Sequence, residues 1–179
     1  SEAGLNPIVF ERGERVEERM SSLSRLRSDG ILSEESNYCF GEGGAGTFSD
    51  GKLQCSKLNP MVRYLFGRWT EFGAPEEILY EAKPHIGSDK LIKMVRNLRD
   101  HIEGLGGQIH FSRKLIGFTQ KSVGRIEIEL DDGSILETEH LILAIGHSAR
   151  DTYKMLHEKG VALEPKAFAV GTRFEHPQS

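Results

Sequence analysis

The chain has 179 residues, of which 37% are hydrophobic and 28% are charged, and its formal net charge is -4. This length is typical of one domain. The slight acidic excess excludes a general attraction to nucleic acid or to an anionic membrane. No apolar run approaches the ~20 residues that a membrane-spanning helix needs. We therefore expect a soluble, cytoplasmic protein with no nucleic-acid or membrane partner.

The chain contains two cysteines, Cys39 and Cys55. A disulfide between them is one alternative. Two reduced thiols are the favoured alternative, because disulfides are rare in cytoplasmic proteins. The sequence has no C-x-x-C pair and no Cys/His spacing typical of zinc, so we predict no metal site.

The first part of the chain predicts one strand and two helices. Pro7–Glu11 is apolar until its final acid, which is typical of a strand buried in a parallel sheet. Glu14–Arg27 has apolar residues at helical spacing, and Asp29–Asp50, rich in Gly, Ser and Asn, predicts a loop. A second helix is expected to begin at Pro60, with Asn59 as its N-cap. The predicted buried stripe of this helix is Met61, Leu65, Trp69 and Phe72.

A long helix and a small antiparallel sheet are expected next. Asp89–Leu105 carries an amphipathic stripe, and Ser88 is its predicted N-cap. Gln108–Phe111 predicts a strand. Asp132-Gly133 is a strong turn signal between two alternating segments. The three predicted strands of this meander are 114–118, 125–130 and 135–139.

The last part of the chain returns to alternating strands and helices. His140–Ile145 predicts another buried strand. Ser148 is the predicted N-cap of a helix that extends to about Glu158, with an acid three residues after the cap. Phe168–Gly171 is one more strand candidate. Together these elements predict an α/β fold.

Gly41–Gly46 spells G-x-G-x-x-G, the pattern of a dinucleotide-binding turn. Such a turn requires an apolar strand before it, a helix after it and an acid ~20 residues further on. Asn37–Phe40 is a weak strand pattern, and Ser49-Asp50-Gly51 is typical of a turn rather than a helix start. We interpret the match as a coincidence of letters and expect a glycine-rich loop.

Pro7–Glu11 supplies a different dinucleotide signal, since it is similar to the second strand of a Rossmann unit. Glu11 would then stand at the carboxyl end of the strand and accept hydrogen bonds from both ribose hydroxyls of an adenosine. Charge-assisted bonds of this kind contribute about 1.5–3 kcal/mol each. Arg12 would border the adenine and its ribose. The alternative is that Glu11 simply ends a strand at the surface, and the strand alone leaves both open.

The order of the later elements matches the second half of an FAD-binding domain. Ala144-Ile145-Gly146 ends an apolar run, as in flavoproteins where the chain passes the cofactor, because glycine permits close backbone approach. In that layout the backbone near Lys114 and Leu115 passes the adenine. We expect a partial Rossmann-like FAD-binding domain over residues 1–179. Within it, 28–88 is a glycine-rich and helical excursion and 114–139 is the three-stranded meander.

These segments together resemble one family, the bacterial and plastid FAD-dependent dehydrogenases of undefined substrate, which have a glutathione-reductase-like flavoprotein fold. The resemblance covers nearly the whole chain. Members of the family are longer and carry a G-x-G-x-x-G turn upstream and a second glycine-rich FAD-contacting segment downstream, both absent from this sequence. Four stretches carry the resemblance: "ESNYCFGEGGAGTFSDGKL" (Glu35–Leu53), "FGAPEEILYEAKPHIGSDKL" (Phe72–Leu91), "LAIGHSARDTYKMLHEKGV" (Leu143–Val161) and "KAFAVGTRFEHPQ" (Lys166–Gln178).

The resemblance implies FAD as cofactor, NAD(P)H as a candidate electron donor of the parent protein, and redox chemistry on an unnamed small molecule. It implies that the Gly41–Lys52 loop lies near the isoalloxazine or the pyrophosphate, with backbone N–H groups facing an anion or flavin N5 and O4. Lys52 and Arg150 would add positive charge there, and the alternative for both is a solvated surface cation. The implied cofactor-binding residues are Glu11, Arg12, Gly43, Gly44, Ala45, Gly46, Lys52, Leu115, Ala144, Gly146 and Arg150.

Three histidines, His85, His147 and His176, are weak candidates for relaying a proton to a reduced flavin. The alternative for each is a hydrogen-bonded structural role. Ser148 is better explained as a helix cap than as a nucleophile, because no base is placed beside it. Trp69 is expected in the core.

Three functional hypotheses stay open. The leading one is a fragment of an FAD-dependent oxidoreductase. The second is a non-enzymatic binding or assembly module that keeps the flavoprotein fold. The third is NAD(P) as the only ligand, in which case Glu11 disfavours NADP because a 2′-phosphate would meet a carboxylate.

The chain begins with Ser close to an apolar strand, so we expect an internal fragment without the first Rossmann strand and its phosphate-binding turn. This predicts an exposed sheet edge beside Pro7–Glu11, and either a homodimer through that edge or a rearranged sheet. It also predicts weak FAD affinity for the chain alone, because the pyrophosphate site at a helix N-terminus is missing.

Overall fold

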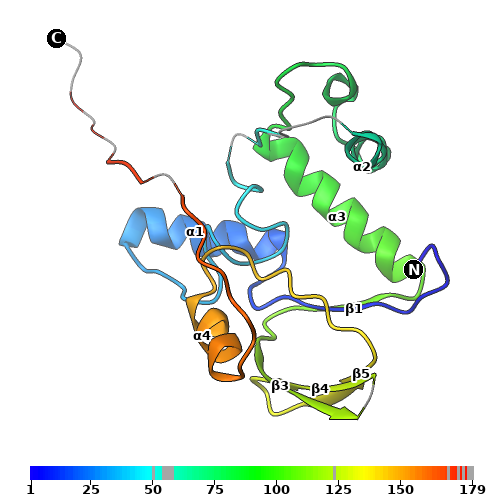
Figure 1. The fold of residues 1–179 in the computed structure, drawn as a ribbon. Helices are drawn as coiled ribbons and strands as arrows, with labels where there is room; N and C mark the ends of the chain where they lie inside the picture. Colours follow the sequence, from blue (N-terminus) through cyan, green and yellow to red (C-terminus); the bar gives the residue numbers. More distant parts are fainter. Residues whose placement is uncertain are drawn as a thin grey trace.

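The structure is a computed structural model that describes residues 1–49, 51–53, 59–122, 124–168, 170–172, 174 and 176. Its elements follow the order β1, α1, α2, the 3₁₀ turn η1, α3, β2, β3, β4, β5 and α4 (Figure 1). They form a two-stranded sheet and a three-stranded sheet. In Figure 1, α3 lies above the β1–β2 pair and the three-stranded sheet lies below it. This is the mixed α/β architecture that the sequence predicts.

The parallel sheet consists of β1 (Ile8–Phe10) and β2 (Gln108–His110). Backbone hydrogen bonds continue this ladder beyond β1 to both ends of Pro7–Glu11. The predicted parallel strand is therefore confirmed. The prediction that it is buried is wrong, because Ile8 and Val9 are 44% and 42% exposed. Parallel strands are buried when other strands and helices cover them, whereas β1 has a strand on one side only in the part of the chain that the structure describes.

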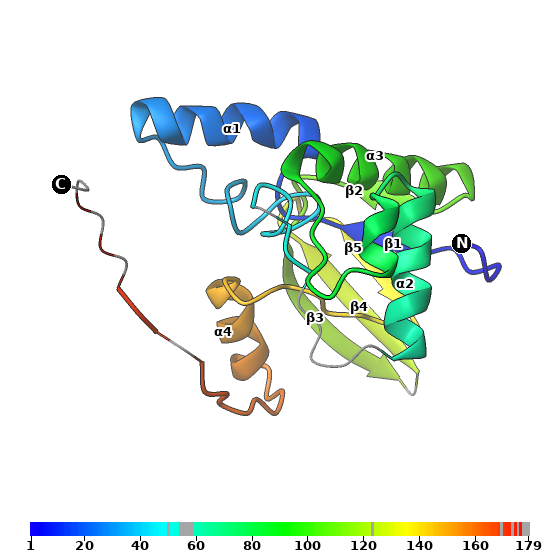
Figure 2. The same ribbon diagram turned by 90° about the horizontal axis from the view of Figure 1, so that it is seen from above.

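The antiparallel sheet confirms the predicted meander. It consists of β3 (Leu115–Ser122), β4 (Arg125–Leu130) and β5 (Ile135–Thr138), paired in that order. Ile128 and Leu130 are buried, as their alternation with glutamates predicts. Figure 2 shows this sheet on the opposite side of the parallel pair from α1 and α3.

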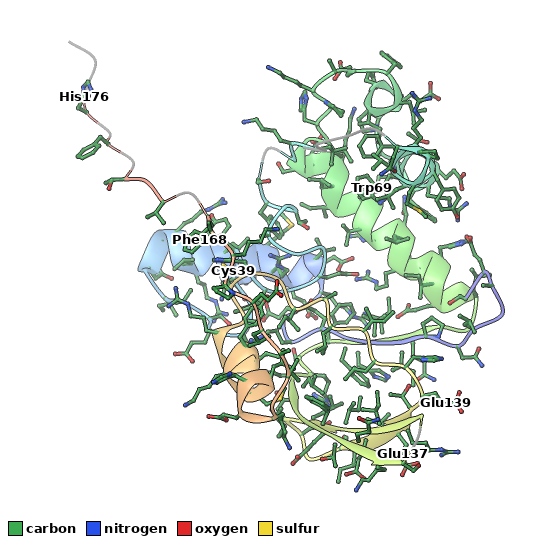
Figure 3. The ribbon with its side chains drawn as sticks, in the orientation of Figure 1. Cys39, Trp69, Glu137, Glu139, Phe168 and His176 are labelled. Atoms are coloured by element: carbon green, nitrogen blue, oxygen red, sulfur yellow. The ribbon has the colours of Figure 1, made fainter. Side chains whose placement is uncertain are left out.

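The main apolar core lies between α2 (Pro60–Glu71), η1 (Glu76–Leu79) and α3 (Ser88–Gly104). The Oδ1 of Asn59 accepts the N–H of Val62 at 3.0 Å, which confirms the predicted N-cap of α2. Trp69 packs against this core between α2 and α3, as predicted (Figure 3). The buried core residues are Phe66, Phe72, Ala74, Ile78, Ile86, Leu91 and Met94.

The predicted stripe of α2 is half wrong. Met61 is 72% exposed and Leu65 is 42% exposed, whereas Phe66 is buried. The prediction is right at Trp69 and Phe72, which belong to the core, and it is one residue off in the first two turns, where Val62 and Phe66 face the core instead. The helix is apolar on both faces at these positions, so periodicity alone does not choose between them.

Two helix starts also differ from prediction. The N-cap of α3 is Gly87 rather than Ser88, and no side chain caps it. The N-cap of α4 (Arg150–Glu158) is Ala149 rather than Ser148, again without a side-chain cap. The carboxylate of Asp151 accepts the N–H of Thr152 at 2.9 Å, so the first turn of α4 satisfies one of its own donors. The helix predicted at Glu14–Arg27 is present as α1 (Val16–Asp29), closed by Gly30 at φ 68°.

The strand predicted at His140–Ile145 is wrong. These residues form neither helix nor strand, and Ile142 is 87% exposed. An apolar segment becomes a strand only beside a partner whose backbone pairs with it, and it has none among the described residues. Of the candidate strand Phe168–Gly171, Ala169 lies outside the described residues, and the other three residues are in neither helix nor strand. The predicted loop is confirmed over residues 31–49.

Candidate functional site

Glu11 stands at the carboxyl end of β1 and holds the loop that crosses it. Its Oε1 accepts the N–H of Gly13 at 2.8 Å and the N–H of Gly41 at 3.0 Å. A Cβ on Gly13 would lie 2.6 Å from the Cα of Gly41, so this close approach requires glycine. Oε2 of Glu11 has no hydrogen-bond partner in the described part of the chain. Glu11 therefore joins β1 to residues 41–49, the glycine loop, and keeps one oxygen for a further donor.

The glycine loop is built around the side chain of Arg19 from α1, which is 0% exposed. The guanidinium donates to the carbonyl oxygens of Asn37 at 2.8 Å, Glu42 at 2.5 Å and Gly44 at 3.0 Å. Gly41 has a φ of 110°, and a Cβ there would lie 2.3 Å from the Cδ of Arg19. Glycine is therefore required at position 41, where the loop backbone packs directly against the buried arginine.

A second buried arginine ties the loop to α3. Arg99 donates to the carboxylate of Glu42 at 2.7 Å, and their side chains are 8% and 10% exposed. Burial raises the pKa of Glu42, although the N–H of Val16 and the charge of Arg99 oppose this. Arg99 also donates to Glu17 of α1 at 2.8 Å, and this hydrogen bond lowers the pKa of Glu17 to about 2.

Arg12 is the centre of a group of four charged side chains, which we call the charge cluster. Its Nε donates to Glu35 at 2.6 Å, and its two terminal nitrogens donate to the two oxygens of Asp151 at 2.9 Å each. Lys114 donates to Glu35 at 2.7 Å. The guanidinium also lies 4.1 Å from the centre of the Phe40 ring. These contacts join the end of β1, the 31–49 loop, the start of β3 and α4.

Hydrogen bonds within the charge cluster shift the pKa values of Asp151, Lys114 and Arg12. The hydrogen bonds from Arg12 lower the pKa of Asp151 to about 2. The hydrogen bond to Glu35 raises the pKa of Lys114. Burial disfavours the charged form of Arg12, but the bonds to Asp151 and Glu35 outweigh it and raise its pKa. These shifts favour the charged forms of Asp151, Lys114 and Arg12 at neutral pH.

The remaining predicted cofactor-binding residues lie in several different segments of the chain. Leu115 follows Lys114 at the start of β3, and Arg150 precedes Asp151 at the start of α4. Ala144 and Gly146 lie in the exposed segment that leads into α4, where the carbonyl of Gly146 accepts the hydroxyl of Tyr153 at 3.1 Å. Arg12 follows Glu11 at the end of β1, and Gly43–Gly46 follow Gly41, the loop residue whose N–H donates to Glu11.

Lys52 lies elsewhere, in an isolated antiparallel bridge with His85. Gly51, with a φ of 64°, approaches Ile86 so closely that a Cβ would meet its carbonyl oxygen at 1.9 Å. This bridge fastens the far end of the 31–53 segment to the start of α3. His85 also lines an open hollow of about 260 Å³ beside η1.

The three candidate histidines lie in different parts of the fold. His85 is in the bridge just described. His147 precedes α4 and places its ring edge-on to Phe168, with 5.6 Å between ring centres. His176 lies far along the terminal segment (Figure 3). The structure therefore does not assemble them into one site.

An open polar hollow of about 410 Å³ lies beside the end of β2. Ser112 next to it has a φ of 50°, a left-handed conformation shared by no other non-glycine residue that the structure describes. Its N–H donates to the carbonyl of Gly13 at 2.9 Å, which explains the turn. The residues lining the hollow are Arg15, Glu18, Ile109, His110, Phe111 and Arg113.

Sequence reasoning missed the residues that hold the site together, namely Arg19, Glu42, Arg99, Glu35 and Asp151. A signal existed for Arg19, because it falls between Val16 and Leu23 on the buried face of α1. Arg99 likewise falls on the inner face of α3 with Leu91 and Met94. A charged residue on an apolar stripe predicts a buried ion pair or hydrogen-bond network.

In the ranges that the structure describes, no cluster of His, Cys, Asp or Glu could hold a metal ion. No helix in those ranges is long and apolar enough to cross a membrane. Cys39 is an exposed free thiol. Cys55, and with it the question of a disulfide, lies outside the described residues.

No protein-family model matches the chain. An uncharacterized protein of Clostridium beijerinckii is 46% identical over 175 residues, which are 98% of this chain and 33% of that protein. The chain thus spans about a third of the length of the curated relative that it matches.

Two similar solved structures are, by their names, a monooxygenase and a hydroxylase. A cyclohexanone monooxygenase mutant from Rhodococcus sp. Phi1 bound to NADP+ has a TM-score of 0.37 and 12% identity, covering 79% of this chain and 26% of that one. An ornithine hydroxylase from Pseudomonas aeruginosa has a TM-score of 0.28 and 15% identity, covering 86% of this chain and 39% of that one. Both TM-scores are below 0.5, so these likenesses carry no argument about this chain.

Proposed function

We propose that the chain is part of an FAD-dependent oxidoreductase, to which it contributes the ribose-binding end of a Rossmann-like unit and a glycine loop beside it. The observation that carries the proposal is Glu11, a carboxylate at the carboxyl end of a parallel strand with one oxygen bound to the glycine loop. Ligands of parallel α/β sheets bind outside the carboxyl ends of the strands. The substrate and the electron donor are left open, with NAD(P)H as the candidate donor.

The residues present fit part of an FAD molecule. The second oxygen of Glu11 suits a ribose hydroxyl, and the exposed backbone of Gly43 and Ala45 suits an anionic or electron-rich group. Arg12 is already held by Glu35 and Asp151, so its role is to shape the rim of the site rather than to bind a phosphate. Bound FAD would supply the two-electron redox chemistry. This chain's own residues would position the ribose and line the site.

The variant Glu11→Gln tests the proposal with little disturbance of the fold. Glutamine keeps an oxygen that accepts the Gly13 and Gly41 amides, but it replaces the second oxygen with an N–H₂ donor. Loss of one charge-assisted hydrogen bond of about 1.5 kcal/mol corresponds to about tenfold weaker FAD binding. FAD titration of the full-length protein measures this. Equal affinity in both proteins, with equal melting temperatures, would argue against ribose binding at Glu11.

Two further predictions await measurement. The first is the homodimer through the exposed edge of β1, where Ile8 and Val9 are half exposed; sedimentation equilibrium of the chain tests it. The second is that the chain alone binds FAD weakly; isothermal titration that finds sub-micromolar affinity would contradict it. A non-enzymatic module predicts instead that the full-length protein binds no flavin at all.

A further inference from the structure

The edge of β2 that faces away from β1, which we call the outer edge, has no partner strand among the described residues. On the inner side, the N–H of Gln108 donates to the carbonyl of Pro7 at 2.9 Å. The carbonyl of His110 accepts the N–H of Glu11, also at 2.9 Å. Residues that bond the neighbouring strand alternate along a parallel ladder, so Ile109 turns its N–H and C=O to the outer edge. Its backbone is therefore open to pairing with an added strand.

The polar hollow of about 410 Å³ lies along this outer edge. Successive side chains of a strand point to opposite faces of its sheet. The hollow is lined by Ile109, His110 and Phe111 in succession, so it runs past the rim of the strand rather than over one face. An extended segment laid beside β2 would occupy this hollow.

Arg15 brings to the hollow a positive charge without a direct acidic partner. Its side chain is exposed and makes no hydrogen bond or ion pair with any residue that the structure describes. Its guanidinium lies over the Phe111 ring, 5.3 Å from the ring centre, and this contact holds it beside the hollow. Arg113 also lines the hollow, but its guanidinium already binds Asp132 at 2.7 Å. Of these two arginines, Arg15 is therefore the one available to a ligand carboxylate.

Glu18 limits what the hollow accepts. It lies one helical turn after Arg15, lines the same hollow and has no ion pair with a described residue. A segment with a run of acids would therefore meet a like charge, whereas a segment with a single acid suits Arg15 alone. A second copy of this chain does not fit, because its own β2, Gln108–His110, carries no acid for Arg15.

We propose that the outer edge of β2 binds an extended peptide segment from outside this chain, which adds a strand to the parallel sheet and places a single Asp or Glu carboxylate against Arg15. In strand addition, backbone hydrogen bonds provide affinity and side-chain contacts provide specificity. Here Ile109 offers the backbone donor and acceptor, and Arg15 offers the selective charge. The site shares no residue with Glu11 or the glycine loop, so it does not depend on the proposed flavin chemistry.

Amide chemical shifts of the ¹⁵N-labelled chain test strand addition. The probe is the peptide acetyl-Thr-Val-Asp-Val-Thr-amide, titrated at constant ionic strength. We expect a saturable downfield shift of the Ile109 amide proton and little change at Gln108, whose N–H already donates to Pro7. No shift of Ile109 at millimolar peptide, or equal shifts of amides all over the surface, would overturn the proposal. A shift of Ile109 that grows with protein concentration in the absence of peptide would identify a second copy as the occupant and would also contradict it.

The role of Arg15 is tested by Arg15→Gln, with Arg25→Gln as the matched control. Arg25 is exposed on α1 and does not line the hollow, so its loss changes the net charge equally. A second peptide with Asn in place of Asp measures the contribution of the carboxylate. We expect the unsubstituted chain to bind the Asp peptide about fivefold more tightly than the Asn peptide. Arg15→Gln should abolish this preference and Arg25→Gln should retain it. A preference that survives Arg15→Gln, or that is lost equally in both variants, would contradict the role of Arg15.

Discussion

Asp151 in the first turn of α4 accepts both terminal nitrogens of Arg12 from the end of β1, at 2.9 Å each. These residues are 139 positions apart in the chain. The pair therefore fastens the last helix to the parallel sheet, next to the carboxylate that we propose as the ribose acceptor. This ion pair explains why α4 stays beside the parallel sheet although the segment before α4 forms no strand.

Replacing Asp151 with Asn should loosen α4. The bidentate pair is partly exposed, with side-chain exposures of 13% and 49%, so we expect a loss of about 1 kcal/mol rather than more. Hydrogen exchange of the α4 amides measures it. Glu158→Gln on the same helix, which breaks only an exposed contact with Lys154 at 3.8 Å, is the control and should leave exchange unchanged. Equal exchange in both variants would show that the Arg12 pair does not hold the helix.

The free energy of unfolding should decrease at acidic pH, and protonation of Glu17 should account for part of that decrease. The pKa of Glu17 drops from 4.5 to about 2 because Arg99 donates to it, so the unfolded chain binds more protons in this range. The stabilisation is complete above about pH 4.5 and is lost as the pH falls toward about 2. Asp151, also lowered to about 2, acts in the same direction but less, because water screens its half-exposed side chain.

Urea unfolding at a series of acidic pH values measures this slope. In Glu17→Gln the free energy of unfolding should be lower at neutral pH and should fall less steeply in acid than in the parent chain. Glu42, whose pKa burial raises, contributes with the opposite sign, since its protonation at falling pH favours the folded state. A variant slope identical to that of the parent chain would contradict the role of Glu17.

Arg99 and Arg96 offer a matched test of buried against exposed pairing, because both lie on α3 and both bind Glu17. Arg99→Met leaves the carboxylate of Glu42 buried and unpaired, which should destabilise the chain by about 3 kcal/mol. Arg96→Met removes a guanidinium that is 48% exposed and should cost less than about 1 kcal/mol. The double variant Arg99→Met, Glu42→Gln should recover part of the loss. Equal losses of stability in Arg99→Met and Arg96→Met, measured by thermal unfolding, would contradict the claim that burial makes the Arg99–Glu42 pair important.

Gly13 and Gly46, one beside the glycine loop and one within it, should differ sharply in their tolerance of alanine. Gly13→Ala places a Cβ 2.6 Å from the backbone of Gly41, and the required shift should cost about 1–3 kcal/mol. Gly46→Ala meets nothing within 4 Å, so it should be neutral or stabilising by up to about 1 kcal/mol. Melting temperatures of the two variants measure the difference. Similar decreases in melting temperature in both variants would show that close packing on Gly41 is not the reason why position 13 requires glycine.

Local patterns in the sequence predicted much of the fold. The meander followed from the alternation of Ile128 and Leu130 with glutamates, and the start of α2 followed from Asn59 and Pro60, because these signals act within a few residues. The strand at His140–Ile145 failed because strand formation needs a partner, and apolarity does not reveal whether one is present. The stripe of α2 failed for a related reason, since only the position of α3 decides which apolar face is buried.

The candidate site was predicted in part. Glu11 was singled out because it ends an apolar strand, and the structure places it against the glycine loop. The hydrogen bonds of Arg19, Arg99 and Asp151 were beyond prediction, because their partners lie far away in the chain and sequence spacing does not encode such contacts. The glycine stretch is a loop, and residues 47–49 and 51–53 directly after it form no helix, as the turn chemistry predicted.

The central proposal, that the chain belongs to a longer FAD-dependent oxidoreductase, is tested most directly by the visible absorption spectrum of the purified full-length protein. The proposal predicts flavin absorbance, present on purification or after incubation with FAD, that bleaches when NADH or NADPH is added. A full-length protein that is colourless and stays colourless after incubation with FAD would contradict it.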